Sequence, residues 1–561
     1  MSERLPYAWV EIELEGCALS YGVGVCTAAV GVTGPAKCYN TYATCQAKAA
    51  MIANRTPKIL RFADATQPMP DSVDAMPLLT KVSITPTRID REKGLGPRES
   101  VTITLADTTF NDAKMDPYLS SRSTPAIQVS TFWPKMLARM PYWHRRPLTL
   151  WSGFLGGTLV ASHYVIDKID GPNAKGEVTI TAKDVLALAD DDKQKAPVAT
   201  GWALTASISS GATAATIVFS TGPTSGTLVI GDEAMLFTRS GTALTLTRAQ
   251  LGTVAEAHDA GASLQVAYRV QGRIDAVLSA LLIAAGVDAA WIPTATWTAE
   301  ADAWAPEAIL DGWIVEPTGV LSLIKDLCQQ TGSFIWWDAR TQLVQLRFLR
   351  PGLTGESIPL DSESNLLATK LALTSEESRR LTEIWFYHGL RSVVNTETGS
   401  KAFSALAIAA SPDAGDEDGL EWRAPRVMSI KGRYIPSGSL LPSLLAGRYA
   451  IAYRSPPLRL SFVVDGKDPI GLGSYARVTL RGLVNADGIS KPRVAQVLEV
   501  REIQYGHAYE CMAEANGFDG RYAVQMADGQ PDYVSPGLDP GGFQSDIVSG
   551  TIAGDDPYLQ V

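Results

Sequence analysis

Alternation of apolar and polar residues with a period of two begins near Leu78. The stretches KVSITPTRID, SVTITLAD, LTLWSGFLGG, LVASHYVIDKID and GEVTITAKD all follow it. Such alternation is typical of half-buried strands, and the intervening DGPNAKGE has the residues of a turn. We therefore expect an antiparallel, barrel-like β domain over residues 76–199.

The same period returns over residues 356–520. It is seen in RRLTEIWFYHG, RVMSIKGRYI, LRLSFVVDG, SYARVTL and RVAQVLEVREIQY. These runs predict a second barrel-like β domain. A helix is expected to interrupt it from Leu440 to Tyr453.

A helical period appears between the two domains. Apolar residues recur at helical spacing at Ile274, Val277, Leu278, Leu281, Leu282 and Ala285, and again at Val320, Leu323, Ile324 and Leu327. Each set predicts an amphipathic helix. The stretch SFIWWDARTQLVQLRFL then predicts a hairpin, so residues 269–355 should form an α+β helix–hairpin subdomain. A further helical stretch is expected over residues 46–54.

Two other regions differ in composition. Residues 200–268 carry few charges and many Ser, Thr and Gly residues, which indicates a small inserted all-β module. Residues 521–561 hold six Asp and, from Tyr522 onward, no Lys or Arg. This acidic Gly/Pro-rich arm is expected to be disordered or to order against a neighbour. The fold class predicted is thus mainly β and multi-domain, with α+β elements.

Bulk composition excludes several classes of protein. The chain has 561 residues, 46% of them hydrophobic, and a net charge of −10. Its one compact basic cluster is at residues 144–146, so we do not expect the chain to bind duplex DNA tightly. We expect no signal peptide and no membrane span, hence folding in a reducing cytoplasm. There, clustered cysteines more often bind metal than form disulfides.

Four of the six cysteines lie close together in residues 1–75, at Cys17, Cys26, Cys38 and Cys45. Their spacing lacks the paired C-x2-C knuckles of zinc ribbons and the compact spacing of bacterial ferredoxins. Glycines between them would let the backbone wrap a compact ligand. The spacing favours a metal over free thiols or disulfides, but it does not decide between zinc and an iron–sulfur cluster.

The stretch YGVGVCTAAVGVTGPAKCYNTYATCQ resembles a segment of the baseplate hub, or tail tip, proteins of long non-contractile-tailed bacteriophages and gene transfer agents. The resemblance covers about thirty residues. It implies an iron–sulfur cluster, [4Fe-4S] in form, with zinc as the alternative. The implied metal and cofactor ligands are Cys17, Cys26, Cys38 and Cys45.

The same resemblance implies a structural virion protein at the tail tip, assembled in the host cytoplasm as a homotrimer. Two barrel-like hub domains per chain would give six similar units, which would match a sixfold tail tube to a threefold tip. The hub would close the lumen and open for genome ejection. The implied partners are the distal tail protein, the tape measure protein and a central fibre or other tail tip proteins. DNA would be present only in transit, and the host envelope would be contacted indirectly.

An enzyme is the alternative that the motifs disfavour. The five histidines, His144, His163, His258, His388 and His507, are widely spaced, and no H-E-x-x-H, G-x-S-x-G or P-loop motif occurs. We predict no catalytic residues. The aromatic runs FIWWD and EIWFYHG, and likewise Cys328 and Cys511, are interpreted as core, and the acidic run 190–192 as a solvated turn. The runner-up function is a tail-tip adhesin or cell-wall-degrading protein that binds a host surface glycan.

Overall fold

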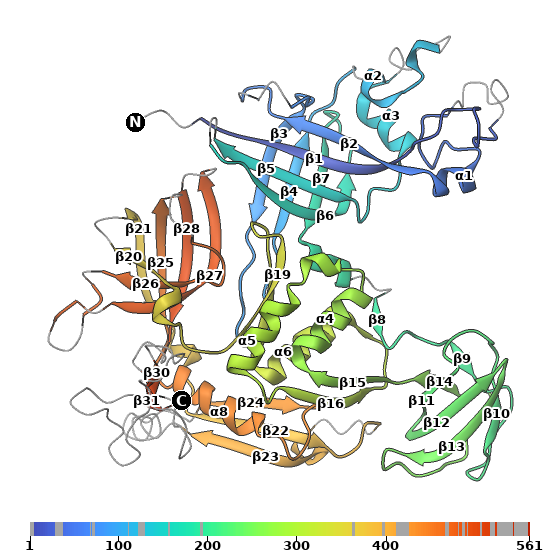
Figure 1. The fold of residues 1–561 in the computed structure, drawn as a ribbon, viewed down its shortest axis with the longest axis vertical. Helices are drawn as coiled ribbons and strands as arrows, with labels where there is room; N and C mark the ends of the chain where they lie inside the picture. The colour runs from blue at the N-terminus through green and yellow to red at the C-terminus, as the bar shows by residue number, and fades with distance from the viewer. Residues whose placement is uncertain are drawn as a thin grey trace.

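Sheets dominate the chain, and its longer helices gather in the middle (Figure 1), which confirms the mainly β, multi-domain fold. The computed structural model describes residues 5–28, 38–67, 69, 73–109, 112–121, 130–154, 157–190, 194–361, 365–394, 399–410, 426–465, 470–480, 482–484, 488–490, 492–504, 508–516, 522–523, 542–543 and 559–560. No helix within these ranges is long and apolar enough to cross a membrane.

The first β unit is a seven-stranded sheet with strand order β2-β1-β5-β6-β7-β4-β3. Its strands are β1 (Pro6–Cys17), β2 (Arg55–Ala63), β3 (Leu79–Thr85), β4 (Ser100–Leu105), β5 (Pro147–Phe154), β6 (Val160–Asp170) and β7 (Val178–Lys183). Its helices are α1 (Lys48–Ala53), α2 (Asp112–Met115) and α3 (Phe132–Arg139). The sheet crosses the expected boundary at residue 75, because β1 and β2 flank the cysteine segment and pair within this sheet.

The middle unit has the largest apolar core, built from helices, short sheets and a hairpin. Its helices are α4 (Ile274–Ala284), α5 (Thr294–Trp304), α6 (Val320–Thr331) and α8 (Leu441–Ala452). Its strands are β8 (Lys195–Ala196), β15 (Tyr268–Arg273), β16 (Ile309–Ile314), β17 (Thr318–Gly319), β18 (Ser333–Asp338), β19 (Leu343–Phe348), β22 (Glu383–Leu390), β23 (Phe403–Ala410) and β24 (Val427–Gly432).

The predicted helices over residues 274–285, 320–327 and 440–453 and the predicted hairpin are confirmed. The prediction was incomplete, because α3 and α5 were not expected. Strands β22 to β24 and α8 also depart from the expectation. They fall in the range expected to form the second barrel, yet their buried side chains join the core of the middle unit. Burial of one sheet face against a helix, rather than strand period, decides to which unit a strand belongs.

The second β unit is a six-stranded sheet with order β20-β26-β27-β28-β25-β21. Its strands are β20 (Ser357–Asp361), β21 (Leu366–Ser375), β25 (Leu458–Asp465), β26 (Tyr475–Thr479), β27 (Arg493–Gln504) and β28 (Ala508–Ala515). The predicted arm, residues 521–561, lies mostly outside the described residues. Its described parts are β29 (Tyr522–Ala523), β30 (Gly542–Phe543) and β31 (Leu559–Gln560).

The two β units share one strand order. Numbered along the chain, β20, β21, β25, β26, β27 and β28 occupy the same places in their sheet as β1, β3, β4, β5, β6 and β7 occupy in theirs. Two differences remain. Strand β20 runs parallel to β26, whereas β1 runs antiparallel to β5. Strand β2 has no counterpart among the described strands of the second unit.

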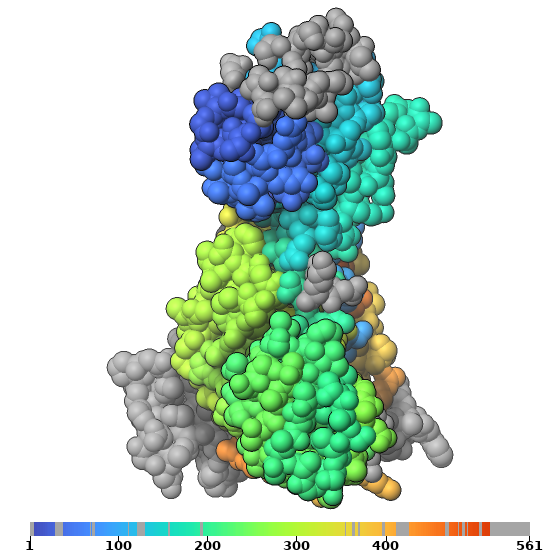
Figure 2. Space-filling model, turned by 90° about the vertical axis from the view of Figure 1, so that its right-hand side faces the viewer, coloured from blue at the N-terminus to red at the C-terminus, as the bar shows by residue number. Residues whose placement is uncertain are grey.

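Residues 202–266 form a six-stranded sheet with its own apolar core. Its strands are β9 (Trp202–Ala203), β10 (Ala214–Thr216), β11 (Ser225–Ile230), β12 (Glu233–Ser240), β13 (Ala243–Gln250) and β14 (Ser263–Val266). Figure 2 shows this inserted module as a rounded body in the lower half of the molecule. The strands on either side, β8 and β15, both pair with strands of the middle unit.

Candidate functional site

Strand pairing brings the first cysteine toward the later ones. Cys17 is the last residue of β1 and lies opposite Arg55, the first residue of β2. The chain between these two strands, residues 18–54, is therefore a long loop whose two ends meet at the sheet. We call it the cysteine segment. Cys26, Cys38 and Cys45 all lie in this segment, and α1 forms its C-terminal part. Antiparallel pairing thus returns a long loop to its starting point.

Asn40 connects the middle of the cysteine segment to Cys17 and to Tyr118. Its backbone carbonyl accepts a hydrogen bond from the Cys17 amide (3.0 Å), and its Nδ2 donates to the Cys17 carbonyl (3.2 Å). Its Oδ1 accepts a hydrogen bond from the Tyr118 hydroxyl at 2.9 Å. The residue has a φ of 54°, a left-handed conformation that asparagine tolerates better than most residues.

Backbone amides point at two of the sulfurs. The Asn40 amide lies 3.3 Å from Cys38 Sγ, and the Gly22 amide lies 3.5 Å from Cys26 Sγ. Gly22 has a φ of 68°, so this approach uses a backbone conformation that favours glycine. Amide-to-sulfur hydrogen bonds stabilise thiolates and tune the clusters that thiolates hold.

The four thiols are near enough to influence one another. Burial raises the pKa of the Cys38 thiol, and nearby Cys45, Cys17 and Cys26 raise it further. Burial also raises the pKa of the Cys45 thiol, with added repulsion from Cys17 and Cys26. Four thiolates in this place would repel each other, and a bound cation would remove that penalty.

These residues fit a thiolate-bound metal in donor type. Four soft sulfur donors are what zinc and iron–sulfur clusters take. Within the described residues, no three His, Cys, Asp or Glu side chains are placed to share one metal ion. Ligation would therefore require the sulfurs to draw closer. Residues 29–37, between Cys26 and Cys38, lie outside the described part.

The cysteine segment is seated on the first β unit by charge and aromatic contacts. The Arg139 guanidinium stacks 4.0 Å above the Tyr39 ring centroid. Arg139 also pairs at 3.0 Å with Asp112, a buried carboxylate that Lys135 contacts at 3.2 Å. The seat consists of α2 and α3, so these short helices position the cysteine segment.

Sequence reasoning missed three residues that act at this site. Asn40 matched the flanking motif but was assigned no role, whereas Tyr118 and Arg139 carried no signal in the sequence. Tyr118 accepts a hydrogen bond from the Tyr21 amide at 2.8 Å and donates to Asn40. Only the packing of the α2–α3 region against the cysteine segment brings these residues together.

The four histidines that the structure describes do not converge. His144, His163 and His388 contact the Asp167 carbonyl, the Thr149 hydroxyl and the Pro436 carbonyl respectively. His258 contacts Glu233 in the inserted module, and His507 lies outside the described residues. Of the acidic run, Asp190 pairs with Arg98, and residues 191–192 lie outside the described part.

The aromatic run FIWWD is core, as predicted. Phe334, Trp336 and Trp337 are buried, as are Phe386 and His388 of the second run. Cys328 and Cys511 are also buried, and burial raises the pKa of each to about 12. Such thiols stay protonated and behave as small apolar side chains.

Comparisons with known proteins found no matching family model and no curated protein of similar sequence. Similar solved structures of low identity include three tail proteins. A prophage tail protein, gp18, from Listeria monocytogenes EGD-e has 11% identity and a TM-score of 0.35, over 79% of this chain and 91% of that one. The 43 kDa tail protein of prophage MuSo2 from Shewanella oneidensis has 10% identity and a TM-score of 0.35, over 77% and 97%. A tail protein from Neisseria meningitidis MC58 has 11% identity and a TM-score of 0.34, over 78% and 98%.

Proposed function

We propose that the chain is a structural protein of a bacteriophage tail, and specifically the central baseplate hub at the tail tip. The observation that carries this proposal is the repeat of one strand order in the two β units of one chain. Three copies of a chain with two similar units present six similar units around one axis. A trimer of this kind can join a sixfold tube to a threefold tip.

In this role the chain works mechanically. It would join the distal tail protein, hold the end of the tape measure protein, and carry a central fibre or other tip proteins. It would close the lumen and open it for genome ejection. A net charge of −10 suits a conduit through which DNA passes without being bound.

We further propose that Cys17, Cys26, Cys38 and Cys45 hold an iron–sulfur cluster, with zinc as the alternative metal. The bound group would supply cross-links to a segment that has little apolar core of its own. In the described segment, Cys38 is the one buried apolar residue between Leu14 and Met51. The contacts of Asn40 and Gly22 would orient the sulfurs.

Anaerobic purification with an absorbance spectrum and iron, sulfide and zinc analysis tests the metal. A broad band at about 400 nm, with iron matched by acid-labile sulfide, is the expected result for a cluster. Both should be lost when Cys26 and Cys45 are changed to serine. The control Cys328→Ala removes a thiol elsewhere and should retain them. Stoichiometric zinc would keep the cross-linking role but reject the cluster, and absence of metal would reject both.

Mass and location test the hub itself. Sedimentation should give three chains per particle, and gold-labelled antibody should bind the tail tip of intact virions. A monomer with glycan binding or murein cleavage would instead support the adhesin or wall-degrading alternative. Labelling along the tail tube would reject the tip location.

A further inference from the structure

The first β unit is attached to the rest of the molecule at one place. Figure 1 shows it as the upper body of the molecule, and the chain leaves its sheet after β3, returns at β4 and leaves again after β7. Glu99 immediately precedes β4, and Asp184 immediately follows β7. The Asp184 amide donates to the Glu99 carbonyl at 3.0 Å, which fastens two of these crossings together. The two residues therefore lie at a hinge.

Beyond the hinge the chain belongs to the middle unit. After Asp184 it enters the short 3-10 helix η3 (Val185–Asp190), whose buried apolar side chains lie in the core of that unit. Asp184 itself is 1% exposed. Its Oδ1 accepts a hydrogen bond from the Leu186 amide at 3.1 Å, whereas its Oδ2 is buried and has no hydrogen-bond partner among the described residues. A charged carboxylate is costly in such a place, and a protonated one is neutral.

The cations around Asp184 are engaged with other groups. Arg98, whose charge acts on it, pairs with Asp190. The Arg98 Nη1 is also buried without a hydrogen-bond partner in the described part of the chain. Two further cations bind elsewhere: Lys183 pairs with Asp167 at 2.9 Å, and Arg145 donates to the Leu188 carbonyl at 3.4 Å. An ionised Asp184 would therefore lack a hydrogen-bonded counter-charge at this junction.

A second acidic group lies beside it. The Tyr164 hydroxyl donates to the Glu99 carboxylate, and Tyr164 is buried. Burial raises the pKa of Glu99 and outweighs the hydrogen bond from Tyr164. Groups of the middle and second β units also act on it: two acidic ones raise its pKa and one guanidinium lowers it, namely Asp338, Glu502 and Arg340. Ionisation at the hinge thus adds negative charge to an acidic surrounding.

Asp184 should exchange its proton near neutral pH. Burial raises the pKa of its carboxyl to about 7, and the charge of Glu99 adds to the rise. The charge of Arg98 and two backbone amides oppose this without cancelling it. A raised pKa means that the docked state binds the proton more tightly than an opened state does. Docking should therefore weaken as the pH rises from about 4 to about 7 and stay level above that.

A cleft of about 100 Å³ lies beside the hinge, where the three units meet. Its walls come from β5 and β6, from the turn between β18 and β19, and from β27 and β28. Arg340 holds that turn to the second β unit, since its Nη1 donates to the Ile470 carbonyl at 2.8 Å and its guanidinium lies 4.3 Å from the Tyr509 ring centroid. The first unit is the wall that would move if it tilted at the hinge.

We propose that this junction is a pH-dependent hinge: a proton on Asp184 keeps the first β unit docked on the middle unit, and loss of the proton lets the first unit tilt and open the cleft. In the opened state the Asp184 charge is hydrated, and the acidic groups across the cleft no longer face one another at short range. The hinge is a property of the single chain, and it holds whether or not the chain is a tail hub.

Hydrogen exchange of the full chain tests the proton. Asp184→Asn keeps an oxygen for the Leu186 amide but cannot ionise. Peptide 186–190 is compared between wild type and variant at about pH 5.5 and about pH 8, so that the intrinsic exchange rate cancels at each pH. The variant should exchange more slowly, and the ratio of the two rates should grow about tenfold or more between these pH values. A purely structural effect of the substitution would give a ratio independent of pH.

The matched control is Asp170→Asn. This carboxylate lies at the end of β6 in the same unit, and it is exposed and paired with Lys168 at 2.8 Å. It should exchange as the wild type does at both pH values. Peptide 233–240 of the inserted module should be alike in all three proteins and serves as the internal reference.

Small-angle X-ray scattering of the wild-type chain tests the movement and needs no variant. The radius of gyration should rise reversibly from about pH 5.5 to about pH 8, and Asp184→Asn should stay compact at both. A constant wild-type radius, or an exchange ratio that does not change with pH, would overturn the proposal. A pH-dependent hinge in a chain that is absent from the tail tip would leave the proposal standing and reject only the hub.

Discussion

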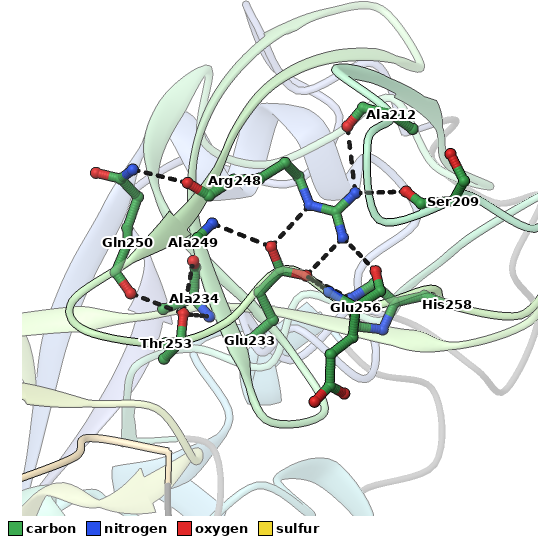
Figure 3. A network of polar contacts seen from close by, with 10 residues as sticks. All are labelled: Ser209, Ala212, Glu233, Ala234, Arg248, Ala249, Gln250, Thr253, Glu256 and His258. Atoms are coloured by element: carbon green, nitrogen blue, oxygen red, sulfur yellow. Dashed lines mark hydrogen bonds and ion pairs between the residues drawn. The ribbon is translucent and has the colours of Figure 1, made fainter.

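Glu233 shows how one buried charge fixes the loops of the inserted module (Figure 3). Its side chain is fully buried, and it accepts two hydrogen bonds from Arg248, from Nε at 2.7 Å and Nη2 at 2.5 Å. The His258 Nε2 lies 2.9 Å from the same carboxylate, and the amides of Ala249 and Glu256 donate at 3.1 Å. Five contacts, from β13 and from the loop that follows it, thus meet at one residue.

Stability of the inserted module should depend on pH through Glu233. Burial would raise the pKa of this carboxyl, but the hydrogen bonds of Arg248, Glu256, His258 and Ala249 outweigh it and lower the pKa to about 2. A lowered pKa means that the native state favours the charged form. The stabilisation should be complete above about pH 4.5 and should disappear as the pH falls toward 2. Hydrogen exchange of residues 202–266 across this range would show it.

Substitution Glu233→Gln should destabilise the module by about 3 kcal/mol, because it leaves the buried Arg248 charge without its partner. The matched control is Glu256→Gln, whose side chain is exposed and should change stability by less than about 0.5 kcal/mol. Hydrogen exchange of β12 and β13 in the full chain separates the two. Equal effects of both changes would contradict the role given to the buried carboxylate.

Asn40 should control how well the cysteine segment keeps its metal. Asn40→Ala removes the side-chain hydrogen bonds to the Cys17 carbonyl and from Tyr118, and it places alanine at a φ of 54°. We expect a loss of about 2 kcal/mol in the stability of the segment. Metal per chain after a fixed time with a chelator should fall several-fold.

The control for that prediction is Asn54→Ala. Its Nδ2 bonds the Ala50 carbonyl of α1 at 2.9 Å, a local contact that touches none of the cysteines. It should retain metal as the wild type does. Equal loss from both variants would show that general loosening of the segment, rather than the Asn40 bridge, governs retention.

At the scale of elements, the loop between β3 and β4 does more than connect two strands. It leaves the first β unit, and the Ile89 amide donates to the Leu498 carbonyl of β27 at 2.8 Å. The Gly94 carbonyl accepts from the Ile335 amide of β18 at 3.0 Å. One loop therefore contacts both the second β unit and the middle unit.

Gly94 permits this contact, since a Cβ there would lie 2.2 Å from the Cys328 Cβ of α6. Its φ of +74° adds strain for any other residue. Gly94→Ala should cost about 3 kcal/mol, as overpacking and backbone strain add. Protection of α6 and β18 amides in hydrogen exchange would measure it. Gly211→Ala, where nothing lies within 4 Å, should change little.

The sequence predicted those helices whose apolar residues recur on one face over several turns. Helix α6 buries Val320, Leu323, Ile324 and Leu327, the residues that predicted it. Helix α5 was missed, because its buried side chains are Trp297, Glu300 and Ala301, which form no apolar stripe. Glu300 is buried only because Arg347 (2.7 Å) and Arg350 (2.9 Å) pair with it, and both come from the β19 region.

At the scale of the whole molecule, a buried ionic network joins the units. Glu514 of β28 pairs with Arg91 of the β3–β4 loop and with Arg379. Arg379 also contacts Glu92 at 2.7 Å and the Tyr453 hydroxyl at 3.1 Å. Burial would raise the pKa of Glu514, but the charges of Arg91 and Arg379 lower it below its usual value.

Glu514→Gln should therefore destabilise the junction by about 3–5 kcal/mol, because the buried Arg91 guanidinium loses its counter-charge and Arg379 loses one of its two carboxylate partners. Since the native pKa is lowered, the wild-type stabilisation should be present above about pH 4.3 and fall as the pH drops below it. Differential scanning calorimetry should show the units unfolding in separate steps in the variant. Glu13→Gln, at an exposed position, should unfold as the wild type does.

The sequence alone determined the mainly β class, most of the longer strands and the helices with a regular apolar stripe. It did so because strand and helix periods are local, and a few consecutive residues carry each of them. It also singled out Cys17, Cys26, Cys38 and Cys45 as one group, since clustered thiols are conspicuous in a chain otherwise poor in cysteine.

Only the tertiary structure decided which strands share a sheet, that the two β units repeat one strand order, and that β22 to β24 join the middle core. It alone brought Tyr118 to Asn40 and Arg91 to Glu514, residues far apart in the chain. The physical reason is that pairing and burial depend on surfaces assembled from distant segments. Periodicity shows that a residue will be buried, but not against what.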